Sequence, residues 1–327
     1  MLRVAEVPDP GPPGPGQALV AVRASSVHAD AWHTVTGLPY VMRLMGNGLR
    51  PRGGVPGSDV AGAVVAVGDG VDHLSPGDRV WGETIDGIPW RDGGAWAERV
   101  LAPADALARI PPGVSDEQAV AVGTPGVLAL EVLRDQGRLR AGASVCVNGA
   151  AGAMGQQLVQ LAKALGAGRV VGVDRGETAD ALRALGCDDA VDHLTDDVTT
   201  RGERFDVVID VASSRPYRDW WPVLAPHATY VRVGHDHYGQ GMNRWLGSMV
   251  GVLSLMARAP FDEHIHGVDR SAPRPQRLAE LSAMLADGVL RPTVAAALPL
   301  ERTVEALRLL ESGTVAGRIV LTIGRGA

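Results

Sequence analysis

A glycine-rich turn between an apolar run and a helical pattern constrains the fold of this chain more than any other feature. Residues 143–148 have the composition of a buried strand, and the turn "NGAAGAMG" follows them directly. Within the turn, Ala150, Gly152 and Gly155 keep the G-x-G-x-x-G spacing, with alanine in the first place. A helical pattern and a second strand follow, and that strand ends on Asp174. This order predicts a βαβ unit that binds a dinucleotide; the alternative is a tight structural turn.

Each part of this unit has an expected contact with the cofactor. Gly152 lets the backbone approach the pyrophosphate, Gly155 lets the helix pack closely on the strand, and the first helical amides face the phosphates. The Asp174 carboxylate accepts hydrogen bonds from both ribose hydroxyls of NAD and repels the 2′-phosphate of NADP. Arg175, the next residue, could bind the 2′-phosphate of NADP instead. The alternative for Asp174 is that it is a solvent-exposed acid in a turn, without a role in binding. The sequence therefore favours NAD over NADP.

The ends of two later strands, in "DVVIDV" and "VRVGHDH", are expected beside the nicotinamide. His235 and His237 form a His-x-His pair there, which we interpret as part of a polar loop rather than a metal site. The cofactor-binding residues predicted from these patterns are Gly149, Ala150, Gly152, Ala153, Met154, Gly155, Asp174, Arg175, Val211, Val233, Gly234 and His235.

The order of strand and helix patterns divides the chain into two domains. Up to residue 118, short β-rich runs alternate with glycine and proline turns, which predicts an antiparallel barrel-like domain. Residues 119–266 alternate apolar runs with helical periods, which predicts a doubly wound parallel sheet of the Rossmann type. Residues 267–327 return to the first domain, so the fold is α/β with the parallel-sheet domain inserted in the other.

Composition and charge exclude several classes of protein. The net charge is −6 and no block of like charge occurs, which argues against binding to nucleic acid. The longest apolar stretch, about residues 245–257, is too short for a membrane span, and the first residues lack the apolar core of a secretory signal. The two cysteines lack metal-binding or disulfide-framework spacing. We therefore expect a cytoplasmic protein without a membrane partner.

Four segments together resemble the medium-chain dehydrogenase/reductase superfamily along nearly the whole chain. They are "VPGSDVAGAVVAVGDGV…LSPGDRVWGE", "GGAWAERVLAP", the glycine turn and "AGRIVLTI". The resemblance implies a GroES-like catalytic domain around the Rossmann domain, an active site between them, and a homodimer. It also implies a further strand before "LRVAEVPDP", so either the catalytic domain lacks this strand or the native start lies upstream.

The resemblance implies that the positions of catalytic zinc ligands hold other residues in this chain. They are His28, Ser58 beside Asp59, and Thr124. His28 and Asp59 are possible zinc ligands, but Ser58 and Thr124 offer only hydroxyl groups. A catalytic zinc site needs about three deprotonated N, S or O ligands, so these four residues do not form one. The chain therefore resembles the zinc-independent branch, the quinone oxidoreductase and enoyl-reductase-like members. We count Thr124 among the cofactor-binding residues and expect no metal.

Three residues are candidates for proton transfer. His28 stands where this branch usually has asparagine, and either donates to a substrate carbonyl or is a structural histidine. His33 matches the place of a relay histidine in some zinc enzymes, but a surface or ribose contact suits a metal-free site better. Tyr40 lies near the tyrosines that line such sites, where a phenol protonates an enolate; packing beneath the loop is its alternative role.

Without a metal to polarise a carbonyl, substrates that accept hydride readily are favoured. We therefore predict an NAD(P)H-dependent reductase of an activated C=C bond or a quinone, with a biosynthetic intermediate as one possible substrate. The alternatives are a zinc-free alcohol/ketone dehydrogenase and a cofactor-binding protein without redox turnover. The apolar segment 239–261 either lines the pocket, which implies a large apolar substrate, or forms a dimer contact or a core helix.

Overall fold

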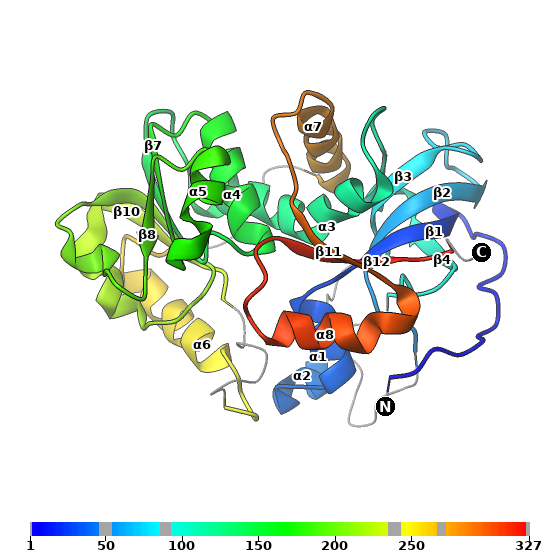
Figure 1. Cartoon of the computed structure of the whole chain (residues 1–327), viewed down its shortest axis with the longest axis horizontal. Helices are drawn as coiled ribbons and strands as arrows, with labels where there is room; N and C mark the ends of the chain where they lie inside the picture. Colours follow the sequence, from blue (N-terminus) through cyan, green and yellow to red (C-terminus); the bar gives the residue numbers. More distant parts are fainter. Residues whose placement is uncertain (1, 46–53, 86–92, 235–242, 267–272, 325–327) are drawn as a thin grey trace.

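Two separate β-sheets organise the computed structural model of the chain, which describes residues 2–45, 54–85, 93–234, 243–266 and 273–324. In Figure 1 the parallel sheet lies among the green segments, and the other sheet lies among the blue, cyan and red segments. The predicted combination of a mainly antiparallel sheet with a doubly wound parallel sheet is confirmed.

The first sheet has seven strands, in the order β11-β12-β1-β2-β3-β5, with β4 paired to β1. The strands are β1 (Gln17–Val27), β2 (Asp59–Val67), β3 (Arg79–Glu83), β4 (Arg99–Pro103), β5 (Leu107–Arg109), β11 (Val294–Pro299) and β12 (Arg318–Thr322). All pairs are antiparallel except β11 with β12, because helix α8 (Thr303–Glu311) returns the chain between them. The sequence of α8 has a helical pattern and that of β12 is β-rich, whereas the alanines of β11 carry little strand preference.

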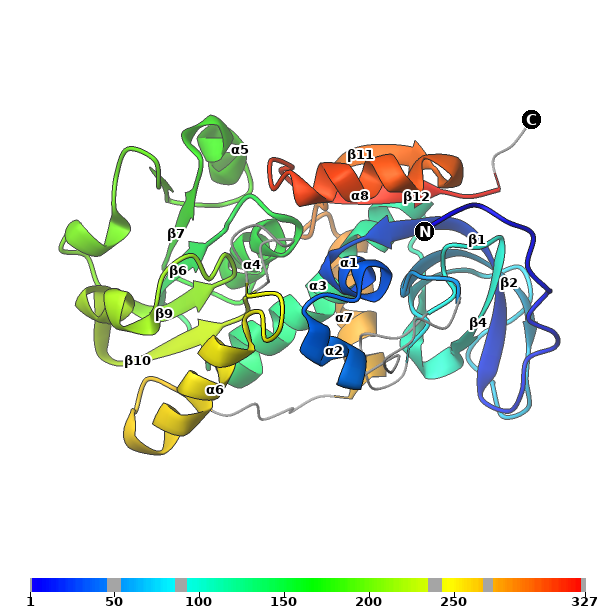
Figure 2. The same ribbon diagram turned by 90° about the horizontal axis from the view of Figure 1, so that it is seen from below.

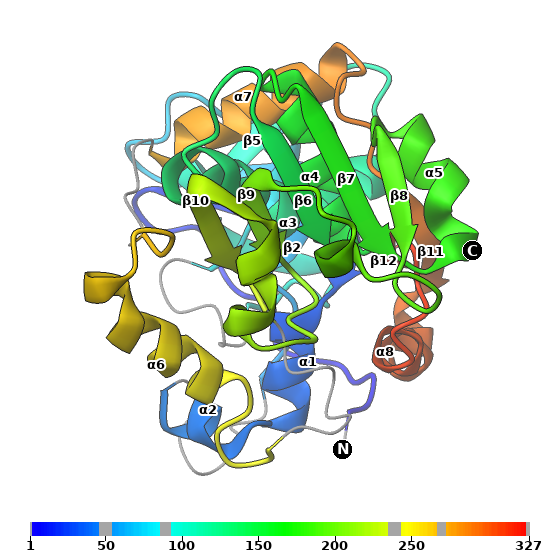
Figure 3. The ribbon, with the colours of Figure 1, turned by 90° about the vertical axis from the view of Figure 1, so that its left-hand side faces the viewer.

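The second sheet has five parallel strands in the order β10-β9-β6-β7-β8. They are β6 (Ser144–Asn148), β7 (Arg169–Asp174), β8 (Asp189–Asp192), β9 (Phe205–Asp210) and β10 (Leu224–Arg232). In chain order this is the 3-2-1-4-5 arrangement of dinucleotide-binding sheets, whose ligands lie where the order reverses, at the carboxyl ends of β6 and β9. Figure 3 shows the five strands side by side, with α5 (Ala179–Ala184) beside β8.

Helix α3 (Asp116–Glu131) connects the two sheets. It begins with a capping box between Ser115 and Gln118, and it packs on helix α4 (Ala153–Ala164), which follows the glycine turn. One continuous apolar core includes Trp81 of β3, Leu130 of α3 and Ile209 of β9, so α3 joins the sheets through buried side chains. The other α-helices within the described residues are α1 (Ala29–Thr36), α2 (Tyr40–Met45), α6 (Met249–Arg258) and α7 (Arg274–Ala286).

The two sheets use different parts of the chain, in keeping with an inserted domain. Strands of the first sheet lie within residues 17–109 and 294–322, and those of the parallel sheet lie within 144–232. The predicted boundary at residue 118 falls in the first turn of α3, and the boundaries at 118 and 266 remain predictions. Over the ranges described above, no helix is both long and apolar enough to cross a membrane.

Candidate active site

Helix α3 is broken at Gly123, and the break places Thr124 against Asp59 at the start of β2. Gly123 has φ 20° and ψ −139°, which are not helical, and Pro125 begins the second half of the helix. The amide of Thr124 donates to Oδ1 of Asp59 at 3.0 Å, and its hydroxyl donates to the same oxygen at 2.6 Å. A Cβ on Gly123 would lie 2.7 Å from the Asp59 carboxylate, so only glycine fits there.

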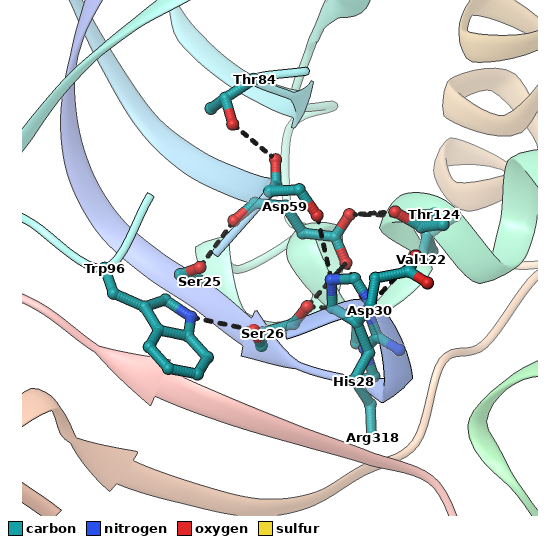
Figure 4. Close-up of polar contacts among 12 residues, drawn as sticks. Ser25, Ser26, His28, Asp30, Asp59, Thr84, Trp96, Val122, Thr124 and Arg318 are labelled. Atoms are coloured by element: carbon teal, nitrogen blue, oxygen red, sulfur yellow. Dashed lines mark hydrogen bonds and ion pairs between the residues drawn. The ribbon is translucent and has the colours of Figure 1, made fainter. Parts of the chain in front are cut away.

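Asp59 forms a buried ion pair with Arg318 of β12, which lies near the other end of the chain. Asp59 is fully buried, and Arg318 is 6% exposed. Nη2 of Arg318 contacts Oδ2 of Asp59 and donates to Oγ of Ser26 at 2.7 Å, while Ser26 donates to Oδ2 at 2.6 Å. Burial alone would raise the pKa of Asp59, but Arg318 and His28, with side-chain hydrogen bonds, hold it below its usual value. The charge of Asp59 is therefore balanced within the protein (Figure 4).

The imidazole of His28 lies among three oxygen-bearing side chains. Its Nε2 is 3.0 Å from Oγ of Ser58 and 3.9 Å from Oδ2 of Asp59, and its Nδ1 is 3.6 Å from Oδ2 of Asp30. His28 is the N-cap residue of α1, but its side chain makes no capping hydrogen bond. Burial lowers the pKa of His28 to about 4, although the Asp59 charge opposes this shift. At neutral pH the ring is therefore uncharged and has one donor and one acceptor nitrogen.

The donor atoms gathered at this place do not suit zinc. One imidazole, from His28, and the hydroxyls of Ser58 and Thr124 are weaker ligands than the three deprotonated groups that a catalytic zinc needs. The Asp59 carboxylate already pairs with Arg318 and accepts hydrogen bonds from neighbouring side chains. Within the described ranges, no group of three or more His, Cys, Asp or Glu side chains is placed to hold a metal ion. These residues therefore do not fit a catalytic zinc ion.

Two residues of this cluster are missed by the sequence analysis. Arg318 lies 259 positions from Asp59, and only the three-dimensional pairing of β12 with β1 brings them together. The sequence signal for such a residue is Asp59 itself, because an acid within an apolar strand needs a polar or charged partner once it is buried. The second is Glu83 at the end of β3, where burial and the Asp59 charge raise the pKa of the carboxyl group and Arg274, 3.9 Å away, opposes them.

The glycine turn has the geometry expected of a phosphate-binding loop. The predicted turn residues lie together at the start of α4: Gly149, Ala150, Gly152, Ala153, Met154 and Gly155. A Cβ on Gly155 would lie 2.1 Å from the Gly149 carbonyl oxygen, so the helix packs directly on the turn. A Cβ on Gly152 would meet only that oxygen, at 3.6 Å, and would otherwise point into open space. Gly152 is the N-cap and offers no side-chain cap, so the first amides of α4 are available to an anion.

The acid at the end of β7 supports the glycine turn directly. Oδ2 of Asp174 accepts a hydrogen bond from the Ala151 amide at 2.8 Å, and Oδ1 accepts one from the Arg175 amide at 2.9 Å. A carboxylate has about four acceptor positions, so Asp174 can accept two further donors. The Arg175 guanidinium donates to the Thr314 carbonyl at 2.8 Å and lies 3.2 Å from a Glu177 oxygen, so two groups already hold it.

Residues 314–318 run from this corner to the His28 cluster. Besides the contact of Arg175 with Thr314, the amide of Gly317 donates to the Ala151 carbonyl at 3.0 Å. The next residue, Arg318, forms the ion pair with the carboxylate of Asp59 at the start of β2. The glycine turn and the His28 cluster are therefore neighbouring parts of one site, linked by this segment and by α3.

A buried acid also organises the carboxyl ends of β9 and β10. Asp210 is fully buried, and its carboxylate accepts from Asn148 Nδ2 at 2.7 Å, the Ser213 amide at 2.8 Å and the Tyr230 hydroxyl at 2.8 Å. These bonds tie together three adjacent strands and the loop after β9. The edge of the sheet at which a nicotinamide is expected is thereby fixed.

The later predicted cofactor residues lie at this edge, with one outside the described part. Val211 and Val233 follow β9 and β10 and pack at the margin of the core, and Gly234 has φ 68°. His235 belongs to residues 235–242, which lie outside the described residues, as does the rest of its His-x-His pair.

Of the three candidates for proton transfer, only His28 lies in the cluster around Asp59. His33 is buried in α1, and its Nδ1 is 2.5 Å from the Leu38 carbonyl oxygen, a contact that holds the turn after the helix. Tyr40 packs edge to face on Trp245, with ring centroids 5.2 Å apart, and Arg43 lies over its ring. Figure 2 shows α2, which Tyr40 begins, beside α1, with α6 farther toward the parallel sheet.

Comparisons with known proteins agree with this architecture. The family described as alcohol dehydrogenase GroES-like domain matches residues 14–112, and the family described as zinc-binding dehydrogenase matches residues 185–321. The chain is 32% identical, over 98% of its length, to the pikromycin polyketide synthase component PikAII of Streptomyces venezuelae, and spans 8% of that protein. The GroES-like character predicted for the first domain is thereby confirmed.

Two solved structures share the whole fold. An NAD-dependent alcohol dehydrogenase is 25% identical, with a TM-score of 0.79, and the match covers 98% of this chain and 96% of that one. The quinone oxidoreductase of Escherichia coli, complexed with NADPH, is 22% identical with a TM-score of 0.74, and the match covers 97% and 94%.

Proposed function

Because the chain belongs to the medium-chain dehydrogenase/reductase superfamily, in its quinone oxidoreductase-like branch, we propose that it is an NADH-dependent reductase of activated C=C bonds or quinones. The observation that carries the proposal is the His28 cluster. Where zinc members have ligands, this chain has a neutral imidazole, two hydroxyls and an internally balanced ion pair. Such a site donates hydrogen bonds to an oxygen atom but supplies no Lewis acid.

The surroundings of Asp174 support NAD rather than NADP. Glu177 lies in the turn that follows Asp174, Asp192 of β8 is the register partner of Asp174, and a Cβ on Gly176 would meet the Asp192 carboxylate at 2.6 Å. These charges would repel a 2′-phosphate. Arg175, which directly follows Asp174, would have to leave its two present partners to bind that phosphate.

The chemistry divides between the cofactor and the protein. NADH, when bound, supplies the hydride that adds to the electron-poor carbon of the substrate. The protein's own part is to bind the cofactor at the glycine turn, orient the substrate, and present the hydroxyl of Ser58 to the oxygen on which negative charge develops, while the Thr124 hydroxyl stays bonded to Asp59. Tyr40 and His33 remain predictions for this step, although each has structural contacts that account for its position.

For the substrate, we propose an apolar enone or quinone, with an unsaturated biosynthetic intermediate as the natural form. The likeness to a polyketide synthase component supports this class. Exposed apolar side chains around α6 also suit a large apolar substrate, since Trp245, Leu253 and Met256 are 71%, 56% and 66% exposed.

A zinc-free alcohol/ketone dehydrogenase is the second candidate, favoured by the likeness to an NAD-dependent alcohol dehydrogenase. The same cofactor site would serve this reaction in either direction. Reduction of NAD by a panel of alcohols, without activity on quinones or enones, would favour it.

We propose a second copy of the chain as the protein partner, in the cytoplasm. The parallel sheet ends on β10, and Tyr230 of this strand donates its amide to the His264 carbonyl at 2.8 Å. The segment around His264 would then form the pairing edge. Sedimentation of the purified protein at several concentrations tests the dimer.

Calorimetry with NADH and NADPH tests the cofactor proposal. We expect NADH to bind more tightly, and Asp174→Ala to remove most of that preference because the ribose hydroxyls lose their acceptor. The metal-depleted protein should then oxidise NADH in the presence of a quinone or an α,β-unsaturated ketone. Binding of neither nucleotide, or turnover that appears only after zinc is added, would contradict the proposed function.

A further inference from the structure

We propose that Ser58, His28 and Asp30 form a proton relay that carries a proton from solvent to the reduced substrate, with the Ser58 hydroxyl as the group that donates to it. This inference rests on the proposed function and names the residues that complete it. The ring of His28 connects the other two, since Nε2 lies 3.0 Å from Oγ of Ser58 and Nδ1 lies 3.6 Å from Oδ2 of Asp30.

The relay runs from a more exposed to a more buried position. The Asp30 side chain is 25% exposed, the His28 side chain is 7% exposed, and Ser58 is 8% exposed as a residue. Asp30 lies in the first turn of α1, directly after the N-cap His28, so one short stretch of chain supplies the outer and middle groups. Figure 4 shows Asp30, His28 and Asp59 gathered at this point.

The Ser58 end of the relay is fixed by its neighbours. The Ser58 carbonyl accepts hydrogen bonds from the amide of Thr84 at 2.8 Å and from its hydroxyl at 3.2 Å. The preceding residue, Gly57, has φ 89°, and a Cβ on it would lie 2.3 Å from the ring of Trp96. A backbone held on both sides keeps the Ser58 hydroxyl aimed at His28 rather than free to rotate into solvent with its loop.

The charges around His28 suit transfer rather than storage of a proton. Burial lowers the pKa of His28 to about 4; Asp59 opposes this, and Arg318 and His33 add to it. The ring is therefore neutral and can release a proton from one nitrogen while the other accepts one. Asp59 does not compete for this role, because Arg318 and two hydroxyl groups already hold its carboxylate.

In the proposed reaction the substrate gains one hydride and one proton. Bound NADH would supply the hydride with its two electrons for the new C–H bond at the electron-poor carbon, which would leave an enolate or a hydroquinone anion of the substrate. Ser58 then gives its hydroxyl proton to this anion and takes the Nε2 proton of His28. Nδ1 of His28 receives a proton from Asp30, which takes it from water, so the substrate gains one hydride and one solvent proton.

The test compares Ser58→Ala with wild type and with Ser25→Ala, a matched control. The Ser25 hydroxyl is buried beside the same ion pair, where it donates to the Asp59 carbonyl at 2.7 Å, and lies outside the relay. Steady-state rates with NADH and a quinone or an α,β-unsaturated ketone are measured in H2O and D2O. NADH affinity and thermal melting are recorded for every variant.

We expect Ser58→Ala to lower kcat about 10² to 10⁴-fold, as removal of a general acid does, with NADH affinity unchanged. The solvent isotope effect should rise, because proton delivery becomes limiting. Ser58→Thr, which keeps a hydroxyl, should restore much of the rate, and Ser25→Ala should keep the wild-type rate. Asp30→Asn, at the more exposed end and easier to accommodate, should lower kcat less than Ser58→Ala but in the same direction.

Different outcomes separate failure of the relay from failure of the proposed function. A wild type that turns over while Ser58→Ala and Asp30→Asn keep its kcat and isotope effect would overturn the relay alone. Equal losses in Ser58→Ala and Ser25→Ala would likewise overturn it, since the effect would be structural. A wild type that binds NADH but reduces no acceptor would overturn the proposed function, and the relay with it.

Discussion

Alanine at Gly155 and, separately, at Gly152 should distinguish the two roles of the glycine turn. At Gly155 the added Cβ would lie 2.1 Å from the Gly149 carbonyl oxygen and 2.6 Å from the Ala150 Cα. Both are backbone atoms, so α4 and the turn must separate by about 1 Å to restore ordinary contact, and overpacking on this scale costs about 3 kcal/mol or more. With a urea dependence of roughly 3 kcal/mol per molar, the unfolding midpoint should fall by about 1 M.

The Gly152→Ala variant is the control for this prediction. Its φ is −65°, which alanine adopts readily, and the nearest atom to the new methyl group is the Gly149 oxygen at 3.6 Å. Stability should therefore change by less than about 1 kcal/mol. The methyl group would instead occupy the space over the turn that a pyrophosphate needs, so NADH affinity should fall about tenfold or more, equivalent to at least about 1.4 kcal/mol.

Urea unfolding followed by circular dichroism and calorimetric titration with NADH measure the two effects. If Gly155→Ala unfolds at the wild-type midpoint, α4 does not pack closely on the turn. If Gly152→Ala binds NADH as tightly as wild type, the open space beside Gly152 is not the phosphate site.

Three further predictions concern charge. The pKa of His28 is about 4 in the folded protein and 6.5 in the unfolded chain. Between pH 6.5 and 4, therefore, only the unfolded chain binds a proton at His28. The free energy of unfolding should fall by about 3 kcal/mol over this range as the pH is lowered. Denaturant titrations against pH should show this loss reduced in His28→Gln, and an unchanged slope in that variant would count against it. Arg277→Met should destabilise the protein by about 3 kcal/mol or more, because it removes the buried cation that contacts the carboxylates of Glu131 and Asp135; a denaturant midpoint equal to that of wild type would show that the contact is unimportant. Arg175→Ala should leave NADH affinity within a factor of about three, since its guanidinium is held by protein groups, whereas a loss confined to NADPH in parallel titrations would assign it to the 2′-phosphate.

Sequence patterns located the parallel sheet and its glycine turn because both depend on local spacing. The turn needs small residues at fixed offsets after a strand, and Gly152 and Gly155 meet that need within a few positions of one another. The acid at the end of β7 is local in the same sense. The hydrogen bond from the Ala151 amide to Asp174 was not predictable, because the sequence pattern places Asp174 beside the ribose but does not indicate which protein groups contact it.

The His28 cluster was only partly predictable, since its members are far apart in the chain. The resemblance to a known superfamily identified His28, Ser58, Asp59 and Thr124 as one group, and the structure brings them together. Arg318 escaped prediction because one arginine at the start of an apolar strand has no local feature that identifies its partner 259 positions away. Long-range ion pairs of this kind depend on strand pairing.

The roles of single side chains were harder still to predict. His33 matches the place of a relay histidine in sequence, yet its ring bonds to the Leu38 carbonyl, a contact that depends on the turn after α1. Tyr40 meets Trp245 of a segment more than two hundred positions away. A residue's type and spacing indicate which chemistry is available to it, and its neighbours decide whether that chemistry is used.

Transfer of deuterium from C4-labelled NADH to substrate, in protein shown to be free of metal, is the decisive measurement of zinc-independent hydride transfer. We predict that label appears on the electron-poor alkene carbon of an α,β-unsaturated ketone, that the adjacent alkene carbon takes its hydrogen from solvent, and that added zinc leaves the rate unchanged. Transfer that requires zinc, or that occurs only to the carbonyl carbon of simple ketones, would contradict it.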